Sequence, residues 1–194
     1  SRAAYKLLHA IEHFKINAKG KTCLDLGAST GGFCEVLVDA GASKIYAIDV
    51  GSGQMHESIK PFVINLENTN CKDLDKKLIL DPIDLITCDV SFISLTKALP
   101  AALRLASSNQ QAESGKKPQT ANCSLLALIK PQFEVGKENI KKGVVRDAKL
   151  HQRVIKNITD FLENSGWKVH GITDSPILGG SGNKEFLVYA KLYS

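Results

Sequence analysis

Residues 22–40, TCLDLGASTGGFCEVLVDA, decide the fold of this chain. Thr22 to Leu26 is a short apolar run of the kind that forms a buried strand, and Gly32 to Ala40 has the amphipathic spacing of a helix. The turn between them is rich in glycine, so backbone N–H groups and a helix N-terminus can approach a ligand closely. The stretch predicts a strand, a binding loop and a helix in that order.

The same alternation of short apolar runs and amphipathic runs continues along the chain. Further strands are predicted at 44–49, 62–65, 85–88, 125–129, 167–173 and 185–192, and helices at 1–14, 54–59, 95–105 and 147–165. Strands that alternate with helices predict an α/β fold, a Rossmann-like, doubly wound and mostly parallel sheet with helices on both faces. The last two strands follow one another without a helix, so we expect the final strand to be antiparallel.

The length of 194 residues predicts one domain over residues 1–194. Residues 107–122 are polar and nearly free of large apolar side chains, and we expect them to form a mobile surface insertion. The chain begins with Ser rather than Met, so we also expect it to be part of a longer protein.

Composition narrows the class of protein. The net charge of +5 mildly favours an anionic partner such as nucleic acid. The five cysteines are odd in number and form no C-x-x-C pair, which favours buried, reduced thiols in a cytoplasmic protein over a disulfide framework or a metal site. No run approaches the roughly twenty apolar residues of a membrane span, and no signal peptide is visible.

The glycine-rich turn predicts a site for a nucleoside-like cofactor. Gly27 and Gly32 match the dinucleotide fingerprint G-x-G-x-x-G, but Ser29 stands where the glycine that admits a pyrophosphate belongs. This departure disfavours a dinucleotide and favours a cofactor of the S-adenosyl-L-methionine (AdoMet) type, which has no pyrophosphate. Asp25 is placed to brace the turn and to oppose a sulfonium, and Asp49 stands at the end of the second strand, where a carboxylate accepts both ribose hydroxyl protons. An ordinary turn with a surface aspartate is the alternative.

The complete set of expected cofactor contacts covers this loop, the ends of the second and fourth strands and the segment 66–70, which would border the adenine. Its members are Asp25, Gly27, Ala28, Ser29, Gly31, Gly32, Phe33, Asp49, Val50, Glu67, Asn70 and Asp89.

Three charged residues are predicted to meet at one edge of the sheet. Asp89 closes the fourth strand and Lys130 the fifth, so both lie beyond the carboxyl ends of parallel strands, where ligands bind in open α/β sheets. Glu185 opens the last strand, and an antiparallel strand starts where its parallel neighbours end. Each residue taken singly is also compatible with a surface salt bridge.

The order of these motifs resembles a known family. SRxxxK (1–6), DLGxxxGGF (25–33), an aspartate after the fourth strand, a lysine after the fifth and a glutamate on the last are similar to the FtsJ-like RNA 2′-O-methyltransferases. The blocks DVGxGQ (49–54), LExTN (66–70), DVSFISL (89–95), KPQFE (130–134), GVVRD (143–147) and SGNxE (181–185) resemble the TlyA or haemolysin-like branch of that family.

The resemblance implies an enzyme that transfers a methyl group from AdoMet to a ribose 2′-hydroxyl of RNA, with ribosomal RNA as the expected substrate. The family's catalytic tetrad carries over onto Lys6, Asp89, Lys130 and Glu185, with Lys130 at the hydroxyl either as a cation or as a base. Members of this branch usually carry a small S4-type RNA-binding domain ahead of the methyltransferase domain, and no such domain is present in residues 1–194.

A set of basic residues is expected to bind RNA phosphates, namely Arg2, Lys137, Lys141, Lys142 and Arg146. A solvated basic loop is the alternative reading of the segment 137–146. Two other functions stay open from the sequence. One is a haemolysin-like membrane-active protein, and the other is an RNA-binding module without turnover.

Overall fold

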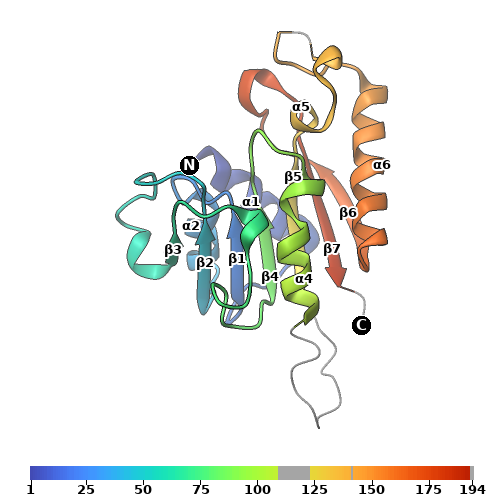
Figure 1. Cartoon of the computed structure of the whole chain (residues 1–194). Helices are drawn as coiled ribbons and strands as arrows, with labels where there is room; N and C mark the ends of the chain where they lie inside the picture. Colours follow the sequence, from blue (N-terminus) through green and yellow to red (C-terminus); the bar gives the residue numbers. More distant parts are fainter. Residues whose placement is uncertain (109–122, 141, 193–194) are drawn as a thin grey trace.

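In the computed structural model, residues 1–108, 123–140 and 142–192 are described, and they form a seven-stranded sheet in the order β3-β2-β1-β4-β5-β7-β6 (Figure 1). The strands are β1 (Thr22–Leu26), β2 (Lys44–Ile48), β3 (Ile64–Leu66), β4 (Leu85–Cys88), β5 (Ser124–Ile129), β6 (Trp167–Asp174) and β7 (Phe186–Leu192). The pairs β1–β2, β1–β4, β2–β3 and β4–β5 are parallel, whereas β7 is antiparallel to both β5 and β6. The predicted Rossmann-like sheet and its antiparallel last strand are confirmed.

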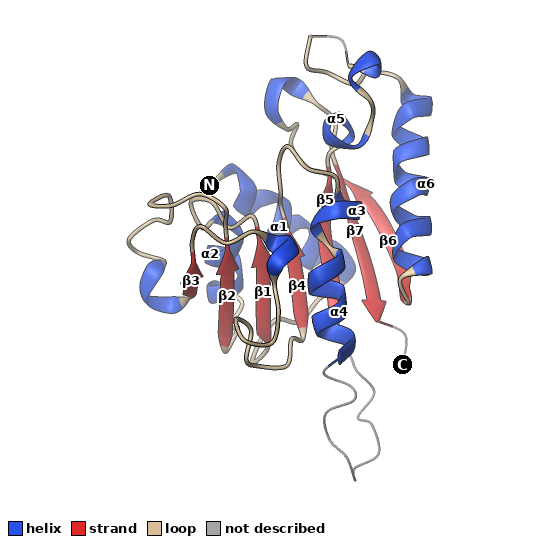
Figure 2. Ribbon diagram, in the orientation of Figure 1, coloured by secondary structure: helices blue, strands red, loops and turns tan. Residues whose placement is uncertain are grey.

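Helices cover both faces of the sheet (Figure 2). The α-helices are α1 (Arg2–Phe14), α2 (Gly32–Asp39), α3 (Leu95–Ala98), α4 (Pro100–Ser108), α5 (Pro131–Glu134) and α6 (Ala148–Asn164), and the short 3-10 helices are η1 (Lys60–Phe62), η2 (Cys71–Asp73), η3 (Lys137–Asn139) and η4 (Gly180–Gly182). Leu7 of α1 and Leu37 of α2 pack on one face with Cys23 and Leu85, and α3, α4 and α6 pack on the other. Strand side chains therefore alternate between two apolar layers.

Burial shows where the tryptophan and the cysteines lie. Trp167, the first residue of β6, is fully buried in the core. All five cysteines are buried and free of disulfides. The helices that the structure describes are all too short or too polar for a transmembrane span.

The structure corrects four of the predicted elements. A helix predicted over 95–105 is broken at Leu99, because Pro100 has no N–H to continue the ladder and instead starts α4. Residues 54–59 form turns rather than a helix, and the 3-10 helix η1 follows them around Pro61. The third strand consequently begins at Ile64, two residues later than predicted.

The fourth correction concerns the predicted insertion at 107–122. Ser107 and Ser108 belong to the last turn of α4. The remainder, residues 109–122, lies outside the described residues, as does Lys141.

Candidate active site

The loop after β1 requires glycine at position 27. Gly27 has φ +79°, and a Cβ atom there would stand 2.6 Å from the backbone carbonyl oxygen of Asp89. The N–H groups of Gly27 and Ala28 donate to the carbonyl oxygen of Ile48 at 2.9 and 3.0 Å. Without a side chain at this position, the loop packs against the ends of β2 and β4, which leaves a hollow beside it.

Asp49 fixes the other wall of this hollow. Its two carboxylate oxygens accept hydrogen bonds from the backbone N–H groups of Ser29 and Gly51, both at 2.7 Å. Each oxygen still has a lone pair, because a carboxylate accepts about four hydrogen bonds. Asp49 is therefore held rigidly by the chain and can accept two hydroxyl protons from a ligand.

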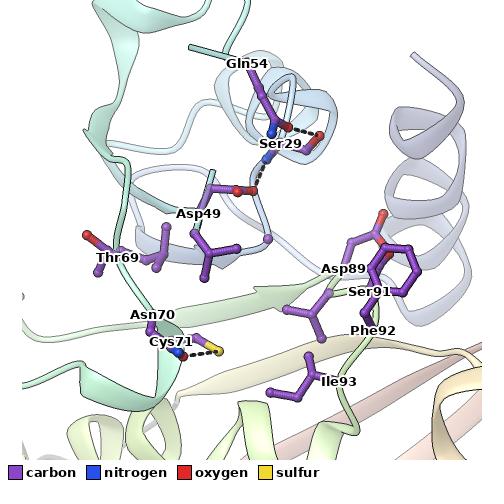
Figure 3. A pocket seen from close by; sticks show the side chains of 14 residues that line it. Ser29, Asp49, Gln54, Thr69, Asn70, Cys71, Asp89, Ser91, Phe92 and Ile93 are labelled. Atoms are coloured by element: carbon purple, nitrogen blue, oxygen red, sulfur yellow. Dashed lines mark hydrogen bonds between the residues drawn. The ribbon is translucent and has the colours of Figure 1, made fainter. Parts of the chain in front are cut away.

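These elements enclose a pocket of about 450 Å³ at the carboxyl ends of β1, β2 and β4 (Figure 3). We call it the first pocket, and its lining residues are Gly27, Ser29, Ile48, Asp49, Val50, Gln54, Thr69, Asn70, Cys71, Asp89, Val90, Ser91, Phe92 and Ile93. Figure 3 shows Asp49 and Ser29 on one side and Asp89, Ser91 and Phe92 on the other. The volume and the mixture of apolar walls with few polar groups are typical of a small-molecule site.

Six of the twelve expected cofactor contacts line this pocket: Gly27, Ser29, Asp49, Val50, Asn70 and Asp89. Ala28 and Phe33 are buried in the core. Gly31 and Gly32 line a separate hollow of about 250 Å³. Glu67 lies outside the pocket lining and accepts a hydrogen bond from the Asn65 side chain at 3.1 Å.

Asp25 is the clearest correction to the expected site. It is fully buried, and its carboxylate accepts hydrogen bonds from the Thr87 hydroxyl at 2.7 Å and the Cys34 thiol at 3.3 Å. Burial raises the pKa of Asp25 to about 7 even though both hydrogen bonds lower it. Strand alternation turns Asp25 toward α2, so the predicted contact with a cationic ligand is wrong. Instead it joins β1, β4 and α2 beneath the loop.

Two close ion pairs occupy the edge of the sheet next to the first pocket. The Nζ atom of Lys130 lies 2.6 Å from Oδ1 of Asp89 and donates to the Ser91 hydroxyl oxygen at 2.8 Å. The Nζ atom of Lys6 donates to Oε2 of Glu185 at 2.7 Å. Lys6, Lys130 and Glu185 are all at most 9% exposed, so both pairs are largely removed from solvent.

Four separate segments bring these charges together. Asp89 follows β4 and Lys130 follows β5. Glu185 precedes β7, and it reaches the same edge because Phe186 of β7 pairs with Ile129, the last residue of β5. Lys6 comes from the first turns of α1, whose N-terminus lies at the same end of the sheet (Figure 1). The structure therefore places all four sequence-predicted tetrad residues at one edge, arranged as two pairs.

A second pocket, of about 400 Å³, lies between and beyond the two pairs. Its lining residues are Ser91, Phe92, Lys130, Gln132, Phe133, Ile140, Gly143, Gly180, Ser181, Asn183 and Glu185. Ser91 and Phe92 line both pockets, so the two pockets adjoin at these residues. One member of each ion pair lines the second pocket, namely Lys130 of the Asp89–Lys130 pair and Glu185 of the Lys6–Glu185 pair.

Phe92 stands at this junction in an unusual conformation. Its φ of +65° is rare for an aromatic residue, its side chain is 90% exposed, and its ring lies 5.0 Å from that of Phe133. Strained, exposed residues of this kind cluster at functional sites.

The comparison with protein families identifies the chain. The sequence model of the FtsJ-like methyltransferases matches residues 1–192. The chain belongs to the FtsJ-like methyltransferase family. Its two adjoining pockets and its two ion pairs are accordingly the candidate active site of a methyltransferase.

The similarity to individual relatives covers nearly the whole chain. A Mycobacterium tuberculosis protein named 16S/23S rRNA (cytidine-2′-O)-methyltransferase TlyA is 41% identical over 98% of this chain and 68% of its own length. Hemolysin A of Brachyspira hyodysenteriae is 37% identical over 97% of this chain and 75% of its own. A solved structure of a hemolysin-like protein from Lactococcus lactis superposes with a TM-score of 0.88 at 38% identity, covering 98% of this chain and 87% of that one.

The structure describes the side chains of three of the five basic residues expected to bind RNA, namely Arg2, Lys142 and Arg146. The guanidinium of Arg2 donates to the carbonyl oxygen of Leu178 at 2.7 Å, and Arg2 lines a polar hollow together with Lys6. Lys142 and Arg146 are exposed. Lys141 and the side chain of Lys137 lie outside the described part of the chain, so the role of this set stays a prediction.

Several residues of the site were not found from the sequence. Gln132 donates to Glu185 at 3.2 Å and lies between the two ion pairs. Asn183 is buried and bridges the segment 143–145 to Gly180 through its side-chain amide. Both stand in motifs of the FtsJ-like resemblance, KPQFE and SGNxE, and that position was the only signal available. In the described ranges, no group of three or more His, Cys, Asp or Glu side chains is arranged to bind a metal ion.

Proposed function

We propose that the protein transfers a methyl group from AdoMet to a ribose 2′-hydroxyl of RNA, and that the RNA is ribosomal. The observation that carries this proposal is the position of Lys130. Its ammonium group is paired with Asp89, which lines the first pocket, and it lines the second pocket itself. A cation at the junction of a cofactor site and an acceptor site suits methylation of a hydroxyl.

The residues of the first pocket fit AdoMet. Asp49 would accept the two ribose hydroxyl protons, because both its oxygens are fixed and still have free lone pairs. The bare backbone at Gly27 leaves room beside Asp89, whose carboxylate favours a positive charge. Asn70 and Thr69 provide polar groups at the other end of the pocket. AdoMet supplies an already activated methyl group on a sulfonium.

The chain's own contribution is to place the acceptor and to stabilise charge. A ribose hydroxyl in the second pocket would meet the ammonium group of Lys130, which would stabilise negative charge on the oxygen while the oxygen gains the methyl group and loses its proton to water. Asp89 keeps Lys130 in position from the cofactor side. The Lys6–Glu185 pair, together with Gln132, forms the opposite wall and limits how the ribose can lie.

An RNA substrate agrees with the charge and the surface of the chain. The net charge is +5, and the exposed Arg146 and Lys142 follow the segment that contributes Gln132. Phe92 offers an exposed aromatic face at the mouth of the second pocket, and single-stranded bases stack on such faces. The relative from Mycobacterium tuberculosis is named for methylation of ribosomal RNA, which favours that class of RNA. The same proposal places the protein in the cytoplasm, where ribosomal RNA and reduced thiols are both found.

The test is methyl transfer from labelled AdoMet to ribosomal subunits that lack the modification, catalysed by the full-length protein. We expect Lys130→Ala to lower the rate by about 100-fold or more, in the range of general acid–base and charge-stabilising groups. Lys156→Ala is the matched control, because Lys156 is an exposed lysine on α6 whose ammonium group pairs with Asp160. Mass-spectrometric mapping of ribose methylation identifies the nucleotide. Equal, background-level transfer by wild type and Lys130→Ala would contradict the proposal.

The names of two relatives give a second candidate, a membrane-active protein. The longest amphipathic helix in the described ranges, α6, does not support it, because its apolar residues Val154, Ile158 and Leu162 are buried against the sheet. A liposome-leakage assay separates the two functions, since the proposed enzyme should release no trapped dye. A third reading, an RNA-binding module without turnover, would be favoured by calorimetry that detects RNA binding and no AdoMet binding.

A further inference from the structure

Ser91 makes a contact that the tetrad does not include. It lies in the loop after β4, and its hydroxyl oxygen accepts a hydrogen bond from Nζ of Lys130 at 2.8 Å. Its side chain lines the first and the second pocket. Ser91 is therefore in direct contact with the lysine and stands where the two pockets adjoin.

The ammonium group of a lysine has three N–H donors and rotates freely on a flexible stem. In Lys130, the Ser91 hydroxyl oxygen accepts one of these N–H groups at 2.8 Å. Oδ1 of Asp89, 2.6 Å from Nζ, is an ion-pair partner whose position does not meet hydrogen-bond geometry. The hydrogen bond to Ser91 therefore sets the rotation of the ammonium group, and because Lys130 lines the second pocket, that rotation decides how its remaining N–H groups meet an acceptor oxygen there.

The loop that carries Ser91 is itself tied to the segment that follows Lys130. The carboxylate of Glu134 on α5 accepts hydrogen bonds from the Ser94 hydroxyl at 2.6 Å and from the N–H group of Leu95 at 2.8 Å. Helix α5 begins at Pro131, directly after Lys130. This link holds the loop and the end of β5 together, so the contact between Ser91 and Lys130 is a built feature of the fold.

We propose that Ser91 is a positioning residue, which fixes the rotation of the Lys130 ammonium group so that one N–H points at the ribose oxygen. The inference rests on the proposed function. It adds a residue that acts through Lys130 and that a tetrad of charged residues does not contain. Because the Ser91 oxygen accepts from Lys130, its own O–H group remains free to donate within the pocket.

Three variants of the full-length protein test the assignment. Ser91→Ala removes the hydroxyl, and Ser91→Thr keeps it at an exposed position that has room for a methyl group. Ser43→Ala is the matched control, because it deletes an exposed serine hydroxyl that donates to the carbonyl oxygen of Gly20 at the amino end of β2, away from both pockets. We expect Ser91→Ala to lower kcat about 10-fold or more with KM for RNA and Kd for AdoMet changed less than about threefold. Ser91→Thr should keep kcat within about threefold of wild type, and Ser43→Ala should leave kcat unchanged.

A second measurement does not depend on turnover. In protein labelled with nitrogen-15 on lysine side chains, the ammonium signal of Lys130 should show restricted motion in wild type and Ser91→Thr, and faster motion in Ser91→Ala. Unchanged motion in Ser91→Ala, or a kcat equal to that of wild type, overturns the role of Ser91. Loss of ordering in Ser91→Ala combined with no methyl transfer by wild type would leave the positioning intact and refute the proposed function instead.

Discussion

Replacing Asp25 by asparagine should make the protein more stable at neutral pH. Asp25 is fully buried, and its pKa is raised from 3.8 to about 7, chiefly by burial. Because the folded state holds this proton more tightly than the unfolded state, the contribution of Asp25 to stability is complete below about pH 4 and is lost as the pH rises through 7. Asparagine has nearly the same shape and does not ionise.

The size of the effect follows from the shift. A difference of about three pKa units corresponds to about 4 kcal/mol, which is the upper limit of the gain at pH 8. The amide oxygen can still accept from the Thr87 hydroxyl, and the amide N–H can donate to the Cys34 sulfur, so the contacts of the carboxylate are largely kept. At pH 4 and below the variant should be equal to wild type within about 1 kcal/mol.

Urea unfolding between pH 5 and 8.5 measures this difference. Trp167 is the only tryptophan and is fully buried, so its fluorescence reports the loss of the core. The free energy of unfolding of Asp25→Asn minus that of wild type should rise with pH and level off above about pH 7.5. A difference that stays constant from pH 5 to 8.5 would refute the raised pKa. An AdoMet affinity reduced more than about tenfold would refute the placement of Asp25 outside the first pocket.

Three other substitutions test the architecture of the site. Gly27→Ala should weaken AdoMet binding at least tenfold in calorimetry, because the added Cβ would stand 2.6 Å from a backbone carbonyl oxygen. Gly20→Ala is the control, since Gly20 has a similar φ of +73° but open space around it. It should cost about 1 kcal/mol of stability and leave AdoMet binding unchanged. Lys6→Met should lower the free energy of unfolding by about 3–5 kcal/mol, because it leaves the carboxylate of Glu185 buried without its cation, and adding Glu185→Gln should restore most of that loss in urea unfolding. Asn183→Ala removes three hydrogen bonds of a buried amide, so we expect a loss of about 2–3 kcal/mol and a raised KM for RNA with Kd for AdoMet unchanged in steady-state assays.

The sheet and the general place of the site could be predicted because they depend on local patterns. Strands such as Leu85–Cys88 are short apolar runs, and a parallel sheet collects the residues after such runs at one edge. Asp49, Asp89 and Lys130 each follow a strand directly, so sequence order alone placed them together. The glycine-rich turn was equally clear, because the contact of Gly27 with the end of β4 leaves no space for a side chain.

The predictions that failed concern contacts that depend on the direction in which a side chain points or on uncharged polar groups. Asp25 lies one residue before the end of β1, and its side chain points into the helical layer that contains Cys34. In a strand buried on both faces, the apolar pattern does not tell which face a given side chain points to. Ser91 and Gln132 lie after strand ends like the predicted residues, but they are uncharged, and a search for charged groups passes over them. The break before Pro100 was visible in the sequence and was outweighed by the apolar spacing around it.

The reversal of β7 explains how a mostly parallel sheet acquires the second ion pair. Parallel strands deliver residues to the ligand-binding edge only after their last residue, as β4 and β5 do with Asp89 and Lys130. Glu185 precedes its strand, and the antiparallel pairing of Phe186 with Ile129 brings it to the same edge. In a parallel arrangement the start of β7 would lie at the far end of β5, roughly 20 Å away for a six-residue strand. Lys6 on α1 would then lose its partner Glu185, so the direction of this single strand is a requirement of the site and not only of the fold.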